Sequence, residues 1–160
     1  MNAGQRGFGA IVAIVILVIM ATISAALVRM GTTQQVTSTQ DILSARAWQA
    51  ARAGNEWGLY QALPHPPLPS PTWCVPGAVG AAQTVAVTTL DLRASTGFSV
   101  TVTCRSESFN EGEISLGVQS VTATFSIEAV ACNSATCPDA ALFATPGYVE
   151  RKRLVTVNTP

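Results

Sequence analysis

An uninterrupted apolar segment near the start of the chain restricts its possible folds more than any other feature. No charged side chain occurs between Phe8 and Val28, and Arg6 supplies the one charge before the segment. About 20 mostly apolar residues cross the ~30 Å hydrocarbon layer of a bilayer as a helix. We therefore expect residues 1–7 to be a short polar leader and residues 8–28 to be a transmembrane helix. The positive-inside tendency places the leader in the cytoplasm and the rest of the chain on the exported side.

The part of the chain after this segment is large enough for one modest domain. Of the 160 residues only 11% are charged and the formal net charge is zero, so a nucleic-acid-binding surface is not expected. The even number of cysteines is typical of an exported domain that contains disulfides. Three pairings are possible, and the short spacing favours Cys132 with Cys137, which leaves Cys74 with Cys104. The spacing does not fit a zinc site, so no metal is expected.

The residues after Val28 continue a helical pattern without a proline until Pro64. We expect one helix over residues 8–62, with residues 29–62 forming an amphipathic half. Small residues recur there at intervals of three and four, which places them on one helix face. They are Ala47, Ala51, Gly54, Gly58 and Ala62. Because small side chains allow close approach of a second backbone, this face is predicted to pack on the protein's own sheet.

The remaining pattern predicts a linker followed by a sheet. Prolines concentrated in residues 64–71 indicate an extended linker over residues 63–82. From residue 83 to residue 160, apolar and polar side chains alternate, as in an antiparallel sheet with one covered face. The expected strands cover residues 83–92, 98–104, 121–129 and 148–157, and the expected loops cover residues 106–113 and 133–147. The predicted fold class is α+β: a long, partly transmembrane N-terminal helix packed on a small antiparallel sheet.

The sequence contains no recognisable catalytic motif. The single histidine, His65, lies inside the proline-rich linker, and no Gly-x-Ser-x-Gly motif or phosphate-binding loop is present. We therefore expect a protein that is not an enzyme and that binds no cofactor.

With these features together, the chain resembles type IV pilins, and the resemblance implies a pilin-like α+β fold. A basic leader, a Gly-Phe junction, a spanning helix and a disulfide-containing sheet carry the resemblance. It implies that a prepilin peptidase cuts after Gly7 and methylates the new N-terminal residue, Phe8. Three stretches are similar to minor pilins encoded with mannose-sensitive haemagglutinin (MSHA) pili: GF-x-AIVAI, ARAWQAARAGNEWGLYQAL and PGYVERKRLVTV.

One position departs from the pattern of the major pilins. These proteins carry a glutamate five residues into the mature chain, where the present chain has Val12. In the family, this glutamate engages the N-terminal amine of the neighbouring subunit already in the filament. A carboxylate in a bilayer needs such a partner. Its absence implies a subunit without a predecessor, at the pilus tip; the alternative is a subunit that enters the filament rarely.

The resemblance implies a minor pilin that initiates or caps an MSHA-type adhesive pilus. Its partners would be other minor pilins, the major pilin, the pilus assembly platform and the prepilin peptidase. It would span the inner membrane once, with its C-terminal domain in the periplasm, and later form part of the pilus at the cell surface. Two alternatives remain: a pseudopilin of a type II secretion system, or a secreted binding domain whose signal peptide is cut near Ser24.

Overall fold

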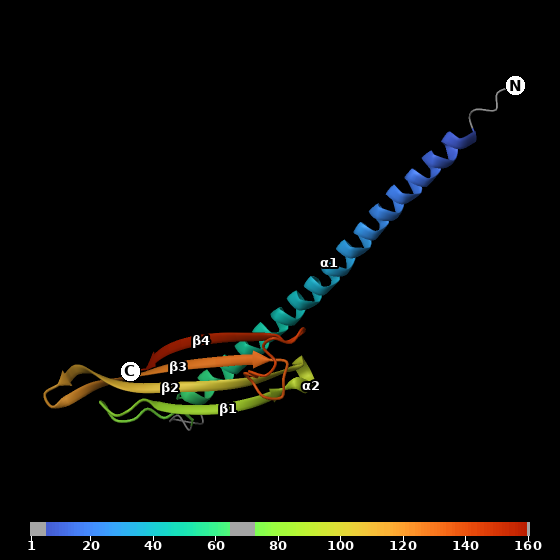
Figure 1. Cartoon of the computed structure of the whole chain (residues 1–160). Helices are drawn as coiled ribbons and strands as arrows, with labels where there is room; N and C mark the ends of the chain where they lie inside the picture. The colour runs from blue at the N-terminus through green and yellow to red at the C-terminus, as the bar shows by residue number, and fades with distance from the viewer. Residues whose placement is uncertain (1–5, 65–72, 160) are drawn as a thin grey trace. The chain divides into compact units, whose positions relative to one another are not determined.

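The computed structural model of the chain describes residues 6–64 and 73–159, without the side chains of residues 6–8 and 30–35. The first five leader residues and His65 lie outside the described residues. The elements follow the order α1, β1, α2, β2, β3 and β4 (Figure 1). The chain divides into two compact units, Met1–Asp41 and Ile42–Pro160, and we call the second the sheet unit.

Helix α1 (Arg6–Ala62) supplies the described part of the first unit. Its segment Gly9–Arg29 has a mean hydropathy of 3.0, and none of it is buried inside the protein. The predicted segment, residues 8–28, differs from this one by a single residue at each end. Apolar side chains exposed all around a helix are unfavourable in water and favourable in lipid. By length and composition, this part of α1 is able to cross a membrane.

The sheet unit contains four antiparallel strands in sequential order. They are β1 (Thr84–Leu92), β2 (Phe98–Ser115), β3 (Val118–Cys132) and β4 (Glu150–Thr159). The short helix α2 (Arg93–Thr96) connects β1 to β2. It ends at Gly97, whose φ of 85° lies in the left-handed region that glycine adopts without strain. The predicted α+β fold class is confirmed.

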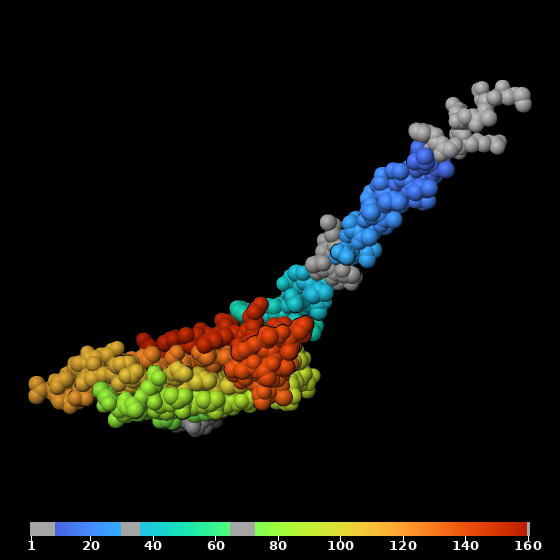
Figure 2. Space-filling model, viewed as in Figure 1, coloured from blue at the N-terminus to red at the C-terminus, as the bar shows by residue number. Residues whose placement is uncertain are grey.

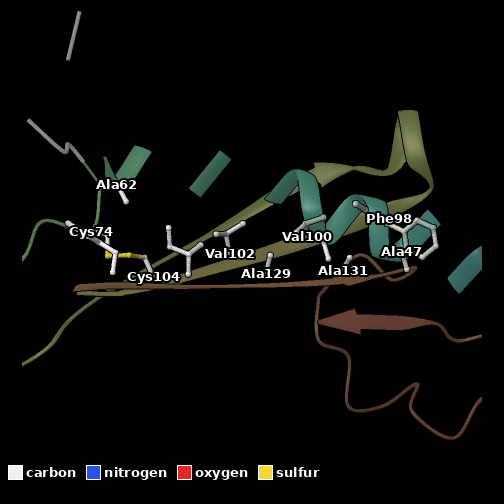
Figure 3. Close-up of a cluster of buried hydrophobic side chains, with 13 residues drawn as sticks. Ala47, Ala62, Cys74, Phe98, Val100, Val102, Cys104, Ala129 and Ala131 are labelled. Atoms are coloured by element: carbon white, nitrogen blue, oxygen red, sulfur yellow. A yellow bond between two sulfur atoms is a disulfide. The ribbon is translucent and has the colours of Figure 1, made fainter. Parts of the chain in front are cut away.

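The core of the sheet unit lies between α1 and the two central strands (Figure 3). Alternate residues of β2 and β3 point to the same face of the sheet, and most of those on the face toward α1 are apolar and buried. These are Phe98, Val100, Val102, Cys104, Phe125, Ile127, Ala129 and Ala131. The period-two pattern in the sequence arises from this burial, because the opposite residues are mostly Ser and Thr.

The prediction of a loop over residues 106–113 is wrong. These residues belong to β2, which pairs with β3 from Ser99↔Cys132 to Ser115↔Val118, with irregularities at Asn110/Gly112 and Glu113/Ser115. Polar side chains suggested a loop, but the hydrogen bonds of a strand ladder join backbone groups and tolerate polar side chains. The strands predicted over residues 98–104 and 121–129 are therefore both too short.

Candidate functional site

In the sheet unit, the small-residue face of α1 lies in close contact with β2 and β3. Ala47, Ala51 and Ala62 are fully buried. A Cβ atom at Gly54 would lie 2.6 Å from Cγ1 of Val100, and one at Gly58 would lie within 3 Å of Cγ2 of Ile127. The helix backbone thus lies directly on the sheet, and these two positions have no room for a side chain. All five residues of the predicted packing face lie at this contact.

Two tryptophans and a disulfide close the C-terminal end of this interface. The rings of Trp57 in α1 and Trp73 pack edge to face, with centroids 5.1 Å apart. The next residue, Cys74, forms a disulfide with Cys104 of β2, with a Cα–Cα distance of 5.9 Å. This disulfide fixes the chain to β2 at Cys74. Both disulfides match the pairing that the spacing favoured.

Strand β4 is connected to α1 by two arginines. The guanidinium group of Arg151 donates hydrogen bonds to Oγ of Ser44. Arg153 lies over the ring of Trp48, 4.4 Å from its centroid, in a cation–π contact. The sequence analysis did not identify these residues as contacts, because Ser44 and Arg151 are 107 residues apart in the chain. Ser44 and Trp48 are four residues apart beside the small-residue face, which is the one signal available in the sequence.

The loop after β3 lies against the sheet face opposite α1, and Figure 2 shows it in orange at one end of the sheet. The disulfide between Cys132 and Cys137 closes its first turn, with Cα atoms 5.6 Å apart. Both cysteines are buried with Val130, and Tyr148 packs beside them. The hydroxyl of Thr101 in β2 donates a hydrogen bond to the carbonyl of Cys137. The loop is therefore part of the packed structure of the sheet unit.

Side-chain hydrogen bonds fix the remainder of this loop. The hydroxyl of Tyr148 donates to Oε2 of Glu150 at 2.6 Å and accepts from the backbone N–H of Asp139 at 3.2 Å. Asn133 donates to the carbonyl of Gly147 at 2.7 Å. Burial, followed by the hydrogen bond to Glu150, raises the pKa of Tyr148 above its ordinary value. These contacts hold the loop against the sheet.

The positions that the resemblance to type IV pilins singles out lie in the first unit. Gly7 and Phe8 are within α1, and their side chains are outside the description. Val12 is partly exposed, at 40%, in the segment able to span a membrane. Cleavage after Gly7 and methylation of Phe8 stay predictions.

Within the described residues, no group of three or more His, Cys, Asp or Glu side chains could hold a metal ion. Arg93 and Asp91 form an ion pair within one turn of the chain. The Arg93 guanidinium donates hydrogen bonds to the carboxylate of Asp91 and lowers the pKa of Asp91 to about 2. Both residues are solvent-exposed, at the corner between β1 and α2. This pair is a local turn contact and does not form a reactive site.

Comparison with known proteins gives no match to a protein-family model, to a curated protein or to a solved structure. A functional interpretation therefore depends on the residues of this chain. Helix α1 is the feature that says most about function, because it combines a segment able to span a membrane with a face packed on a disulfide-linked sheet.

Proposed function

We propose that the protein is a minor type IV pilin of the MshP type, which initiates or caps an MSHA-type adhesive pilus at its tip. One observation carries this proposal. The same helix, α1, contains an apolar segment able to span a membrane and a small-residue face that packs on an antiparallel sheet. A separate signal peptide would require no such continuation of the helix into the folded domain.

The proposed mechanism has two stages, and each uses a different part of α1. Before assembly, Gly9–Arg29 holds the protein in the inner membrane and the sheet unit lies in the periplasm. The prepilin peptidase then cleaves after Gly7 and methylates Phe8. In the filament, the apolar segment packs against the helices of the major pilin and other minor pilins, while the sheet unit faces outward. The protein acts by packing and carries out no chemical reaction of its own.

The exposed apolar side chains of the segment support this mechanism. Ile14, Leu17 and Met20, for example, are each more than 60% exposed. Exposed apolar surface of this extent requires lipid or other apolar helices as its surroundings. Lipid would cover this apolar surface while the protein is in the membrane, and the helices of neighbouring subunits would cover it in the filament.

Val12 supports a position at the tip. A carboxylate inside a bilayer would need a partner, because an unpaired acidic side chain costs about 2.5–3.5 kcal/mol at the centre of a spanning helix. A subunit inside the filament obtains that partner from the amine of the subunit before it. The first subunit has none, so an apolar side chain is the favourable choice at its position 12.

A deletion of the gene with complementation tests this function. We expect the deletion to reduce the number of pili and the adhesion of cells, and the wild-type gene to restore both. Val12→Leu, the matched control, should also restore them, whereas Val12→Glu should restore them incompletely because its carboxylate lacks a partner. Unchanged pili and adhesion after deletion would contradict the proposal. Loss of protein secretion with normal pili would identify a type II secretion pseudopilin.

A further inference from the structure

The hairpin at the end of β2 and β3 extends beyond the neighbouring strands (Figure 1). Pairing with β1 ends at Thr84↔Ser106, and pairing with β4 ends at Ala123↔Thr159. Residues 109–122, which we call the tip hairpin, therefore form a two-stranded projection. A projection of this kind buries little of its own surface, since only two strands contribute to it.

The tip hairpin carries apolar side chains where a projection in water should be polar. Leu116 is 101% exposed at the turn, and its neighbours Ile114 and Val118 are 75% and 53% exposed. Contiguous exposed apolar residues of this kind mark an interaction surface. The flanking charges are all acidic: Glu107, Glu111 and Glu113 are present, and residues 106–122 contain no lysine or arginine. The matching partner is thus apolar with a positive charge, and an anionic lipid surface is unfavourable.

The same protein has a groove with these properties. It has a volume of about 390 Å³ and lies between α1 and α2 within the sheet unit. Most of the surface that its lining residues expose to the groove is apolar. These residues are Ile42, Ala45, Arg46, Gln49, Ser95 and Thr96. Arg46 is the one charged residue of the lining, and it makes no ion pair within the described parts of the chain. The groove offers apolar surface and an available guanidinium group.

We propose that the tip hairpin of one copy of the chain docks in the groove of a second copy. Leu116 and Ile114 would contact the apolar lining, and the carboxylate of Glu113 would pair with the guanidinium of Arg46. The two surfaces are complementary in both apolar character and charge, and charge complementarity fixes the register of a contact. The groove volume is sufficient for two aliphatic side chains.

The positions of the two surfaces determine the kind of assembly. In the sheet, α2 follows the end of β1 at Leu92↔Phe98, whereas the tip hairpin extends from the opposite end of the strands (Figure 1). Each docked pair consequently retains one free tip hairpin and one free groove. Such a contact is heterologous, and it generates a closed ring or an open helical filament according to the rotation between successive copies. The proposed contact does not rest on the proposed function, because it uses only surfaces of the sheet unit.

Disulfide trapping between two full-length copies tests the contact. The four native cysteines are paired in two disulfides, so an introduced cysteine is the one free thiol of its copy. One copy carries Leu116→Cys and a second, differently tagged copy carries Ala45→Cys, and both are co-expressed in the membrane. We expect a mixed disulfide-linked dimer. The matched control replaces Ala45→Cys with Ala53→Cys, another exposed alanine of α1, and should give at least about tenfold less dimer, equivalent to about 1.4 kcal/mol.

A charge exchange tests the pairing of Arg46 with Glu113. Arg46→Glu in the copy that carries Ala45→Cys should reduce the dimer about tenfold. Glu113→Arg in the other copy should restore it, because the exchange recreates an opposite-charge pair. Restoration also shows that Arg46→Glu leaves the fold intact.

Three outcomes would overturn the proposal. Equal dimer yields for Ala45→Cys and Ala53→Cys would show unspecific collision. A dimer of Leu116→Cys with itself at equal yield would indicate a contact between two tips. Absence of the mixed dimer, with both variants present in the membrane at wild-type levels, would show that the hairpin does not bind the groove.

Discussion

Replacement of Gly54 by alanine tests how closely α1 lies on the sheet. The added methyl group would lie 2.6 Å from Cγ1 of Val100, 3.1 Å from Cβ of Ala129 and 3.3 Å from Cγ2 of Val102. Carbon atoms pack best at about 3.5–4.0 Å, so either the helix or the sheet must move. Valine has one χ angle and strong rotamer preferences, and rotation of Val100 does not relieve the contact freely.

Two opposing terms determine the expected change in the free energy of unfolding. Overpacking of a well-packed core costs about 1–3 kcal/mol. Alanine in place of glycine inside a helix contributes about 1 kcal/mol in the opposite direction. We therefore expect Gly54→Ala to destabilise the sheet unit by about 1 kcal/mol. In the double variant Gly54→Ala/Val100→Ala, the loss of unfolding free energy should differ by about 0.5–3 kcal/mol from the sum of the two single losses. The reason is that the new methyl group fills part of the space vacated by Val100.

Chemical unfolding of the full-length protein in detergent, followed by tryptophan fluorescence, measures these free energies. Trp57 and Trp73 lie at the end of the interface and report its opening. Ala53→Gly, at an exposed position of the same helix, is the matched control and measures the helix-propensity term alone. If Gly54→Ala stabilised the protein by as much as Ala53→Gly destabilises it, the close contact between helix and sheet would be refuted.

Two further predictions concern the covalent and titratable contacts of the sheet unit. Replacement of both Cys74 and Cys104 by serine should lower the free energy of unfolding by about 3–4 kcal/mol, because the disulfide closes a segment with a sequence separation of 30; a loss below about 1 kcal/mol in urea unfolding would contradict this. Raising the pH above 10.0 through the raised pKa of Tyr148 should weaken the loop, because the stabilisation is present only while the phenol keeps its proton and donates to Glu150. The difference in ultraviolet absorbance between wild type and Tyr148→Phe follows this titration, and a midpoint at or below 10.0 would be the contrary result.

The sequence predicts the parts of the fold that depend on periodic burial. The small-residue face of α1 can be predicted because small residues such as Gly54 and Gly58 must be spaced about one helical turn apart to face the same strands. The strands are readable because Val100 and Val102 face the core while Thr101 faces away from it. The cysteine pairing was favoured by the five-residue separation of Cys132 and Cys137, which leaves one partner for each remaining cysteine.

The parts that were not predicted depend on backbone pairing or on distant contacts. Residues 106–113, which include the first part of the tip hairpin, were assigned to a loop because most of them are polar, although a backbone ladder with β3 holds them. The contact of Arg153 with Trp48 joins residues far apart in the chain, and no local pattern identifies it. The groove around Arg46 likewise requires α2 to lie beside α1, which depends on the register of β1 and β2.

The N-terminal mass of the mature protein, measured with and without the prepilin peptidase, tests the proposed pilin class most directly. We predict a chain that begins with N-methylated Phe8 when the peptidase is present and an uncut leader when the peptidase is removed. A mature chain that begins near Ala26 in both cases would contradict the proposal and identify a secreted domain with an ordinary signal peptide.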